Sequence, residues 1–350
     1  MEKERLINFI ENSFIKDLLN NPNITDVSYN GENIFYQDNM VGRVKSSLEV
    51  TQKEVLDFIR QIVNLSDNQF SYTDPILDMS IGRYRINATH MAIARKNRAN
   101  AITFSIRIGY DELRIKEDNT FIKDKAIDLL KLFLNRNKSI VIGGLTSSGK
   151  TEFQKYLISK LKPATRVIII DNVDELDSDY INKSIDLQTW LNLEKFKNIN
   201  FDNLIKNALR NNPDYLIVSE ARGEEMLSIL NSAMSGHPTI TTLHSKDIYS
   251  MYHRMTRLCM LKNQNLKFNE TLEDIFDQFK LLIYLKKEIS KDGKVIRYVD
   301  QIATNRFKNI RLLFKYPNTY YQIPNSIKYD LNLSDEEFIS FKTRWESNNA

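Results

Sequence analysis

A glycine-rich loop between a predicted strand and a predicted helix constrains the fold of this chain more than any other feature. Residues 139–144 read SIVIGG, a short apolar run, and residues 152–161 read EFQKYLISKL, which has helical periodicity. The segment between them, GGLTSSGKT, contains the complete pattern G-x-x-x-x-G-K-T. A loop of this pattern, entered from a strand and followed by a helix, is typical of phosphate-binding sites.

Each residue type in this loop suits phosphate chemistry. Gly144 and Gly149 let backbone N–H groups turn inward around phosphate oxygens, and the N-terminus of the following helix adds a favourable dipole. We expect Lys150 to reach the β- and γ-phosphates and Thr151 to ligate Mg²⁺. The predicted nucleotide-binding set also includes Thr146, Ser147, Ser148 and Glu152. A chance glycine-rich turn is the alternative interpretation, and the complete pattern with its flanking elements weighs against it.

Strands and helices alternate through the second part of the chain. After a helical pattern that begins at Phe121, the strand patterns SIVIGG, TRVIIID, PDYLIVSE and TITTLHS are separated by further helical patterns. This order predicts a mainly parallel sheet covered by helices. The mixed helix and strand patterns of residues 1–108 predict a separate, smaller α/β domain. The charged stretch in 109–121 predicts a linker, and 122–350 a second domain that closes with a helix.

Two predicted strands have acidic residues at their ends. TRVIIIDNVDEL places Asp171 and Glu175 after one strand, and PDYLIVSEARGEE places Glu220 after another, followed by Arg222. Ligands bind beyond the carboxyl ends of parallel strands, so we expect these acids near the phosphate loop, where Mg²⁺ and the attacking water must be organised. Helix caps and solvated turns are the alternative interpretation of such residues.

A third strand pattern, SGHPTITTLHS, has a histidine at each end. His237 and His244 are both candidates to sense a γ-phosphate or to orient water, although a lone histidine is more often structural or exposed. His90 and His253 have no comparable setting and are assigned no role.

Composition limits the class of protein. Of the 350 residues, 42% are hydrophobic and 27% are charged, and the net charge of +4 is spread along the chain, so no specific nucleic-acid binding is predicted. Cys259 is the one cysteine, which excludes an intramolecular disulfide and a four-thiolate zinc site. No uncharged stretch approaches about 18 residues, so we expect a cytoplasmic protein without direct membrane insertion.

Four motifs in a fixed order resemble those of the ATPases that power type II and type IV secretion, conjugation and pilus machines. The P-loop, IIIDNVDEL, ALRNNPDYLIVSEARGEE and SGHPTITTLHS are similar to the Walker A motif, Asp box, Walker B motif and His box of that superfamily. Upstream, NITDVSYNGENIFYQD and GRYRINAT resemble its N-terminal domain. The likeness therefore covers most of the chain.

This resemblance implies an architecture, cofactors and partners. Each subunit is expected to have a PAS-like N-terminal α/β domain before a RecA-like P-loop domain, with ATP and Mg²⁺ as cofactors. Six such subunits would form a homo-hexamer. The implied partners are membrane-embedded secretion, conjugation or pilus components, which would place the protein peripherally at the inner face of the cell membrane.

The resemblance also implies roles for single residues. Glu220 corresponds to the Walker B acid and, with Thr151, to a Mg²⁺ ligand. Asp171 takes the position that polarises the attacking water, and His244 is the His-box residue. The N-terminal domain of the family supplies arginines to nucleotide phosphates, at positions that match Arg85 and Arg107. The planar fork of a guanidinium suits this task because it binds phosphate oxygens bidentately.

The Asp box departs from the family pattern. It begins with Asp171-Asn172, where Glu-Asp is common, and the shorter side chain predicts weaker positioning of water and slow hydrolysis. The four-cysteine zinc element of many type II and pilus-assembly ATPases is absent, which favours the type IV secretion and conjugation branch or the tight-adherence pilus branch. The sequence thus predicts an ATPase motor. A nucleotide-gated scaffold with little turnover and a DNA-translocating RecA-like ATPase are the alternatives.

Overall fold

The computed structural model describes residues 2–66, 68–110, 112–172, 174–176, 184–192, 199–306 and 309–347. The chain divides into two compact units. The first unit comprises Met1–Asp111 with Val173–Glu175 and Ile289–Ile296, and the second comprises Glu112–Asn172, Leu176–Glu288 and Arg297–Ala350. The N-terminal boundary between them falls inside the segment 109–121.

An antiparallel sheet forms the centre of the first unit. Six strands of its described residues pair in the order β3-β2-β1-β8-β5-β4. They are β1 (Ile24–Tyr29), β2 (Ile34–Asp38), β3 (Gly42–Lys45), β4 (Ile76–Ile81), β5 (Tyr84–Thr89) and β8 (Thr103–Ile108), beside a short ribbon of β6 (Arg95–Lys96) and β7 (Ala99–Asn100). Strands β2 and β5 lie in the segments NITDVSYNGENIFYQD and GRYRINAT, which carry the resemblance in the N-terminal part of the chain.

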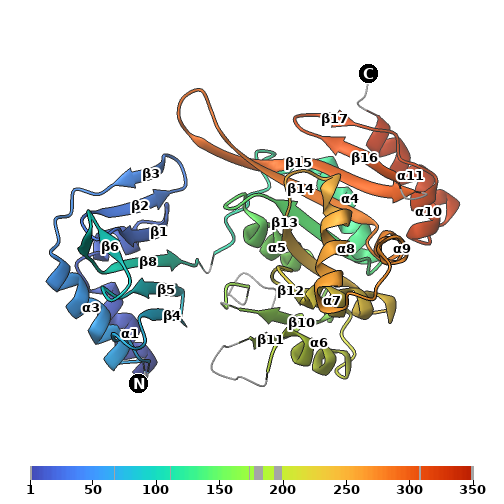
Figure 1. Ribbon diagram of the computed structural model, residues 1–350. Coiled ribbons are helices and arrows are strands. Elements are labelled where there is room, and N and C mark those ends of the chain that lie inside the picture. The colour runs from blue at the N-terminus through green and yellow to red at the C-terminus, as the bar shows by residue number, and fades with distance from the viewer. Residues whose placement is uncertain are drawn as a thin grey trace. The chain divides into compact units, whose positions relative to one another are not determined.

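Helices α1 (Glu2–Glu11), α2 (Lys16–Asn20) and α3 (Gln52–Asn64) belong to the same unit, and Figure 1 shows α1 and α3 against one face of its sheet. Helix α3 begins with a capping box, in which Thr51 and Glu54 satisfy each other's backbone N–H groups. Its apolar stripe, which includes Val55 and Ile59, is buried in the core under the sheet. The helical spacing of the sequence thus places one helix face against the sheet.

A mostly parallel sheet forms the centre of the second unit. Nine strands of the described residues follow the order β11-β10-β12-β13-β9-β14-β15-β16-β17. They are β9 (Ile140–Gly144), β10 (Arg166–Asp171), β11 (Asp186–Leu191), β12 (Tyr215–Val218), β13 (Thr239–His244), β14 (Leu281–Ile289), β15 (Val295–Arg306), β16 (Asn309–Lys315) and β17 (Thr319–Tyr320). Pairing is parallel from β11 to β14 and antiparallel from β15 to β17.

Helices cover both faces of this sheet, and successive residues of one strand enter different cores. In β9, Ile140 and Ile142 pack into the core that contains Phe133 and Phe153, whereas Val141 packs into the core that contains Met251. The helices are α4 (Asp124–Asn135), α5 (Lys150–Ser159), α6 (Phe201–Leu209), α7 (Glu225–Met234), α8 (Ser250–Lys262), α9 (Phe268–Gln278), α10 (Ser326–Asp330) and α11 (Asp335–Glu346). This arrangement confirms the predicted α/β fold class.

The chain closes with helix α11, as its sequence predicts. Ser334 Oγ accepts from Glu337 N and the Glu337 carboxylate accepts from Ser334 N, which completes the capping box. Trp345, near the end of the helix, is buried in the core and donates its indole N–H to Tyr321 O. In the described parts of the chain, no helix combines the length and the apolar character that crossing a bilayer requires.

Candidate nucleotide-binding site

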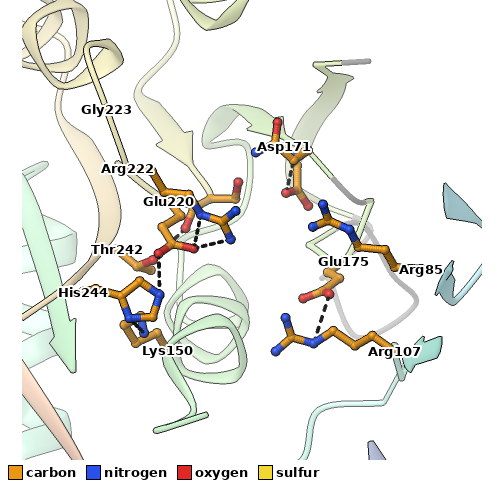
Figure 2. Close-up of polar contacts among 12 residues, drawn as sticks. Arg85, Arg107, Lys150, Asp171, Glu175, Glu220, Arg222, Gly223, Thr242 and His244 are labelled. Carbon is orange, nitrogen blue, oxygen red and sulfur yellow. Dashed lines mark hydrogen bonds and ion pairs between the residues drawn. The ribbon is translucent and has the colours of Figure 1, made fainter. Parts of the chain in front are cut away.

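The phosphate loop lies at the carboxyl edge of the parallel sheet. It joins the end of β9 to the start of α5, and its first residue, Gly144, is paired with His244 of β13 on one side and Leu285 of β14 on the other. Strand β12 ends beside β13 at the same edge, so Glu220 follows close behind it. Figure 2 shows Lys150, His244, Glu220 and Arg222 gathered at this place.

The two glycines of the motif are required for different reasons. A side chain at Gly144 would meet the carbonyl oxygen of Leu285 at 2.8 Å, so the close approach of β14 leaves no room for a Cβ. Gly149 has a φ of 95°, a left-handed conformation that side chains disfavour, although a Cβ there would meet only ordinary contacts. Gly144 is therefore required because there is no room for a side chain, and Gly149 is required because of its backbone conformation.

Polar groups inside the loop match a phosphate ligand. The Oγ atom of Ser148 is buried and has no hydrogen-bond partner among the described residues. A buried hydroxyl without a partner is costly in a folded protein, and a phosphate oxygen would satisfy it. Thr151 lies half-buried in the first turn of α5, whose N-terminus favours anions. The residues present therefore fit the phosphates of a nucleotide.

Lys150 is tied to its own loop and to the neighbouring strand. Its ammonium donates to Gly144 O at 3.2 Å and to Leu145 O at 3.1 Å, and it lies 3.3 Å from His244 Nδ1. The side chain is only 8% exposed. These acceptors place the positive charge of Lys150 at the mouth of the phosphate loop.

The Glu220 carboxylate lies between Arg222 and His244. Its Oε2 atom accepts from Arg222 Nε at 2.9 Å and lies 2.8 Å from Arg222 Nη2. Its Oε1 atom lies 2.9 Å from His244 Nε2, a close polar contact that falls short of hydrogen-bond geometry, since Oε1 has no hydrogen-bond partner in the described residues. Around Glu220, Ala221 N donates to Thr242 O and Thr242 Oγ1 donates to Ser219 O, which ties its backbone to β13.

His244 bridges the lysine and the glutamate in a defined protonation state. Burial lowers its pKa, and Lys150 lowers it further, while Glu220 acts in the opposite direction. The ring is therefore neutral at pH 7. An ammonium can only donate, so Nδ1 must be the acceptor for Lys150. The ring proton then resides on Nε2, on the side that faces Glu220.

Asp171 has a different environment from Glu220. It is 1% exposed, and its Oδ1 atom accepts from Asn172 N at 2.7 Å while its Oδ2 atom accepts from Leu176 N at 3.3 Å. Both oxygens thus cap the backbone of the chain that follows β10. The alternative for acids at strand ends is a helix cap or a solvated turn, whereas Asp171 is buried and bonds to the backbone of irregular chain.

Glu152, one residue after Thr151, is held by its own surroundings. Its Oε1 atom lies 3.3 Å from the ammonium of the buried Lys155, and its Oε2 atom accepts from Arg114 N at 3.4 Å. These contacts fasten the first turn of α5 to the segment before α4. The remaining two residues of the predicted set, Thr146 and Ser147, are exposed at the tip of the loop.

Arg85 and Arg107, in the first unit, are neighbours on adjacent strands. They stand directly opposite each other in the antiparallel pair of β5 and β8. Like charges in that position repel, and an acidic group lies near each arginine. Arg85 lies 3.4 Å from Asp78, and the contact of Arg107 with Glu175 is long, at 3.9 Å, as Figure 2 shows. Each arginine therefore has an acidic group near it in the described residues.

One histidine hypothesis is wrong. His237 precedes β13, whereas His244 is its last residue. A strand rises about 3.3 Å per residue, so a six-residue strand carries the two histidines to opposite edges of the sheet. Only His244 lies at the edge of the phosphate loop. His237 has its Nδ1 atom 3.4 Å from Ser235 Oγ, in the turn after α7.

One residue beside the loop escapes sequence reasoning. Arg297 of β15 donates from Nε to the carbonyl oxygen of Ser147 at 2.8 Å. The two residues are 150 positions apart, and no local pattern marks the arginine. The strand that carries it belongs to the antiparallel end of the sheet, whose register is set by pairing and not by a motif.

Comparison with known proteins identifies the family. Residues 89–306 match the family model described as "Type II/IV secretion system protein", a span of more than half of the 350 residues. The chain belongs to the type II/IV secretion system protein family. The matched span includes the phosphate loop, the acidic strand ends and His244. The match confirms the family that the four motifs predict.

Several relatives in this family are described by their role. The type IV secretion system protein PtlH of Bordetella pertussis is 30% identical over 135 residues, which cover 38% of this chain and 40% of PtlH. The conjugal transfer protein TrbB of Rhizobium radiobacter is 27% identical over 180 residues, 50% of this chain and 51% of TrbB. An uncharacterized protein of Bacillus anthracis is 29% identical over 311 residues, 85% of this chain and 69% of that protein.

Solved structures of family ATPases share the fold. The Legionella pneumophila ATPase DotB superimposes with a TM-score of 0.59 at 22% identity, covering 84% of this chain and 78% of DotB. The pilus retraction motor PilT with bound ADP superimposes with a TM-score of 0.55 at 16% identity, covering 94% of this chain and 88% of PilT. Likeness at this level of identity concerns the fold, in both units of the chain.

Proposed function

We propose that this chain is an ATPase motor that hydrolyses ATP to power a type IV secretion, conjugation or related pilus machine. The observation that carries the proposal is the joined set of Lys150, His244 and Glu220 behind a complete phosphate loop. A loop that only bound phosphate would not need an acid linked to its lysine. Relationship to PtlH and TrbB supports a place in secretion or conjugation.

Each residue of the set has a task in this proposal. The backbone N–H groups of the loop and the N-terminus of α5 hold the β- and γ-phosphates, and Lys150 exchanges its carbonyl partners for phosphate oxygens. Thr151 and Glu220 would hold Mg²⁺, and the ion would supply positive charge beside the phosphates. His244 keeps Glu220 directed at the phosphate end, and Asp171 or Glu220 orients the attacking water.

Arg85 and Arg107 act in the ATP-bound state of this proposal. Their adjacent guanidinium groups bind phosphate oxygens of ATP, and hydrolysis weakens this binding. Their positions directly opposite each other on β5 and β8 support joint binding of one anion. The differential affinity for ATP and ADP then sets how far the open and closed states shift.

The proposal extends to the assembly in which the protein works. Six copies would form a ring at the cytoplasmic face of the membrane, with membrane-embedded components as partners, so that open and closed subunits convert phosphate chemistry into displacement. Family membership supports this assembly. Each subunit would then contribute one nucleotide site.

Steady-state ATP hydrolysis by the purified protein, with particle mass measured by light scattering with and without Mg-ATP, tests this function. We expect turnover that disappears in Lys150→Ala, because loss of a charged contact to phosphate weakens binding by about 100-fold. Lys206→Ala removes an exposed lysine from α6 and should keep wild-type turnover. Equal turnover in the wild type and in Lys150→Ala would rule out the site.

A nucleotide-gated scaffold is the second candidate function. Two features favour it: Arg222 occupies one oxygen of Glu220, and the backbone of its own loop occupies both oxygens of Asp171. In that case neither acid activates water, and binding alone changes the conformation. Tight ATP binding together with negligible wild-type turnover would favour the scaffold over the motor.

A further inference from the structure

We propose that Arg297 is a positioning residue that holds the phosphate loop in its binding conformation. This inference rests on the proposed nucleotide site and adds a residue that contacts neither phosphate nor metal. Arg297 donates from Nε to Ser147 O at 2.8 Å, at the outer tip of the loop. The hydrogen bond joins the tip to strand β15, which lies on the far side of β14 from β9.

The carbonyl that Arg297 binds belongs to a residue in an unfavourable conformation. Ser147 has a φ of 60°, the left-handed region that residues other than glycine rarely adopt. Such a conformation persists only when surrounding contacts enforce it. Ser147 is exposed, so packing supplies little of that enforcement. A charge-assisted hydrogen bond from a guanidinium is the kind of contact that can supply it.

Strand β15 is itself anchored beside the loop, which makes it a firm support. Val299 N, two residues after Arg297, donates to Phe121 O at 2.8 Å. The ring of Phe121 lies 3.5 Å from the position that a Cβ of Gly149 would take, and Arg297 Cδ lies 3.7 Å from the same position. The Phe121 ring and the Arg297 side chain therefore both lie close to Gly149, which has the left-handed conformation.

Arg297 also places a permanent positive charge at the loop. Burial lowers its pKa, and the nearby Arg114 lowers it further, yet an arginine stays protonated at neutral pH. Lys150 and His244 hold the inner side of the loop through Gly144, Leu145 and the end of β13, while Arg297 holds the outer side. Without Arg297, Ser147 is expected to relax, and the N–H groups of the loop lose their convergence on phosphate.

Equilibrium binding of Mg-ADP to Arg297→Ala and Arg297→Lys tests this role, with apo thermal melting as a check on folding. We expect a Kd about tenfold higher for Arg297→Ala, and a smaller rise for Arg297→Lys, which keeps a charged donor. Turnover should show a raised KM with kcat within about threefold of wild type, because the reacting groups are untouched. Ethylguanidine at millimolar concentration should restore part of the affinity of Arg297→Ala.

Arg311→Ala is the matched control. Arg311 is an exposed arginine of the adjacent strand β16, and its removal takes the same charge from the same sheet. It should bind Mg-ADP as the wild type does. Wild-type affinity in Arg297→Ala, or an equal loss in Arg311→Ala, would overturn the role of Arg297 and leave the proposed function intact. If Arg297→Ala does not fold, wild-type affinity in Arg297→Lys without any rise in KM would overturn it. Absence of nucleotide binding by the wild type would refute the site itself.

Discussion

An acidic side chain lies at the end of strand β10 and another lies just after strand β12, and their surroundings differ. The strands are adjacent and parallel, with Ile170 paired to Val218, so Asp171 and Glu220 leave the sheet at the same edge. Glu220 contacts two side chains, Arg222 of its own segment and His244 of the neighbouring strand β13. Asp171 instead accepts from the backbone of its own loop.

This difference separates two kinds of acid at a strand end. The carboxylate of Glu220 can exchange a side-chain partner for a metal or a water without disturbing the fold. Moving Asp171 would break its hydrogen bonds with the backbone N–H groups of residues 172 and 176, which is costly. We infer that Glu220 carries most of the chemistry and that Asp171 mainly shapes the loop.

The largest effect is expected for Glu220→Gln. The substitution keeps the size of the side chain and removes its charge, so ATP should still bind while turnover falls by about 10²- to 10⁴-fold. Single-turnover hydrolysis measures the chemical step directly. Glu224→Gln, an exposed residue four positions later, is the control and should behave as wild type. A loss smaller than that of Asp171→Asn would reverse the comparison.

The pH dependence of turnover should report His244. Its lowered pKa means that the folded protein prefers the neutral ring and binds fewer protons than the unfolded chain. This contribution to the free energy of unfolding is present above about pH 6.5 and is lost as pH falls through the lowered pKa. Turnover should fall over the same range, because a protonated Nδ1 cannot accept from Lys150.

His244→Gln should remove that acid limb and lower kcat by about tenfold, since glutamine does not titrate and its single amide cannot reproduce the two ring nitrogens that face Lys150 and Glu220. The pH profile of kcat is the measurement. His253→Gln changes an exposed histidine of α8 that stacks on Phe268, and it should leave the profile unchanged. An acid limb that survives in His244→Gln would assign it to another group.

Asp171→Asn should have a smaller effect on turnover, about tenfold or less. Its amide keeps one acceptor oxygen and presents N–H groups where the other oxygen bonded, so the hydrogen bond from Leu176 N is lost, at a cost of about 1 kcal/mol. Hydrogen exchange at the Leu176 amide should speed up. Turnover loss as deep as that of Glu220→Gln, with unchanged exchange, would make Asp171 the catalytic acid.

The smallest effect is expected for Arg222→Ala. Arg222 is 57% exposed, and exposed ion pairs contribute about 0.2 to 1 kcal/mol, so releasing Glu220 should raise basal turnover by about two- to fivefold. Initial rates at low and high salt measure this, since screening weakens the pair in the wild type. A tenfold decrease would instead give Arg222 a direct part in catalysis.

Local patterns were sufficient to predict the parallel sheet and the phosphate loop. In β9, loop and α5, strand propensity, glycine positions and helical periodicity all lie within one short segment, so each supports the others. The acidic strand ends and His244 could be predicted to meet because parallel strands end at one edge. By the same rule His237, which precedes β13, lies at the opposite edge of the sheet and is excluded from the site.

Contacts that depend on side-chain rotamers or distant register could not be predicted. Nothing in the sequence shows that Asp171 turns back onto Asn172 N, because an acid at a strand end serves as cap or ligand equally well. The contact of Arg297 with Ser147 requires the pairing of β15 with its neighbours to be known first.

A double-mutant cycle between His244 and Glu220 tests most directly whether these two residues act as one unit. The kcat for ATP hydrolysis is measured for the wild type, His244→Gln, Glu220→Gln and the double variant. If the two residues act together, the double variant should be no slower than Glu220→Gln, since the second change removes an interaction already lost. Losses that multiply would mean that His244 and Glu220 act independently, and would contradict the joined site.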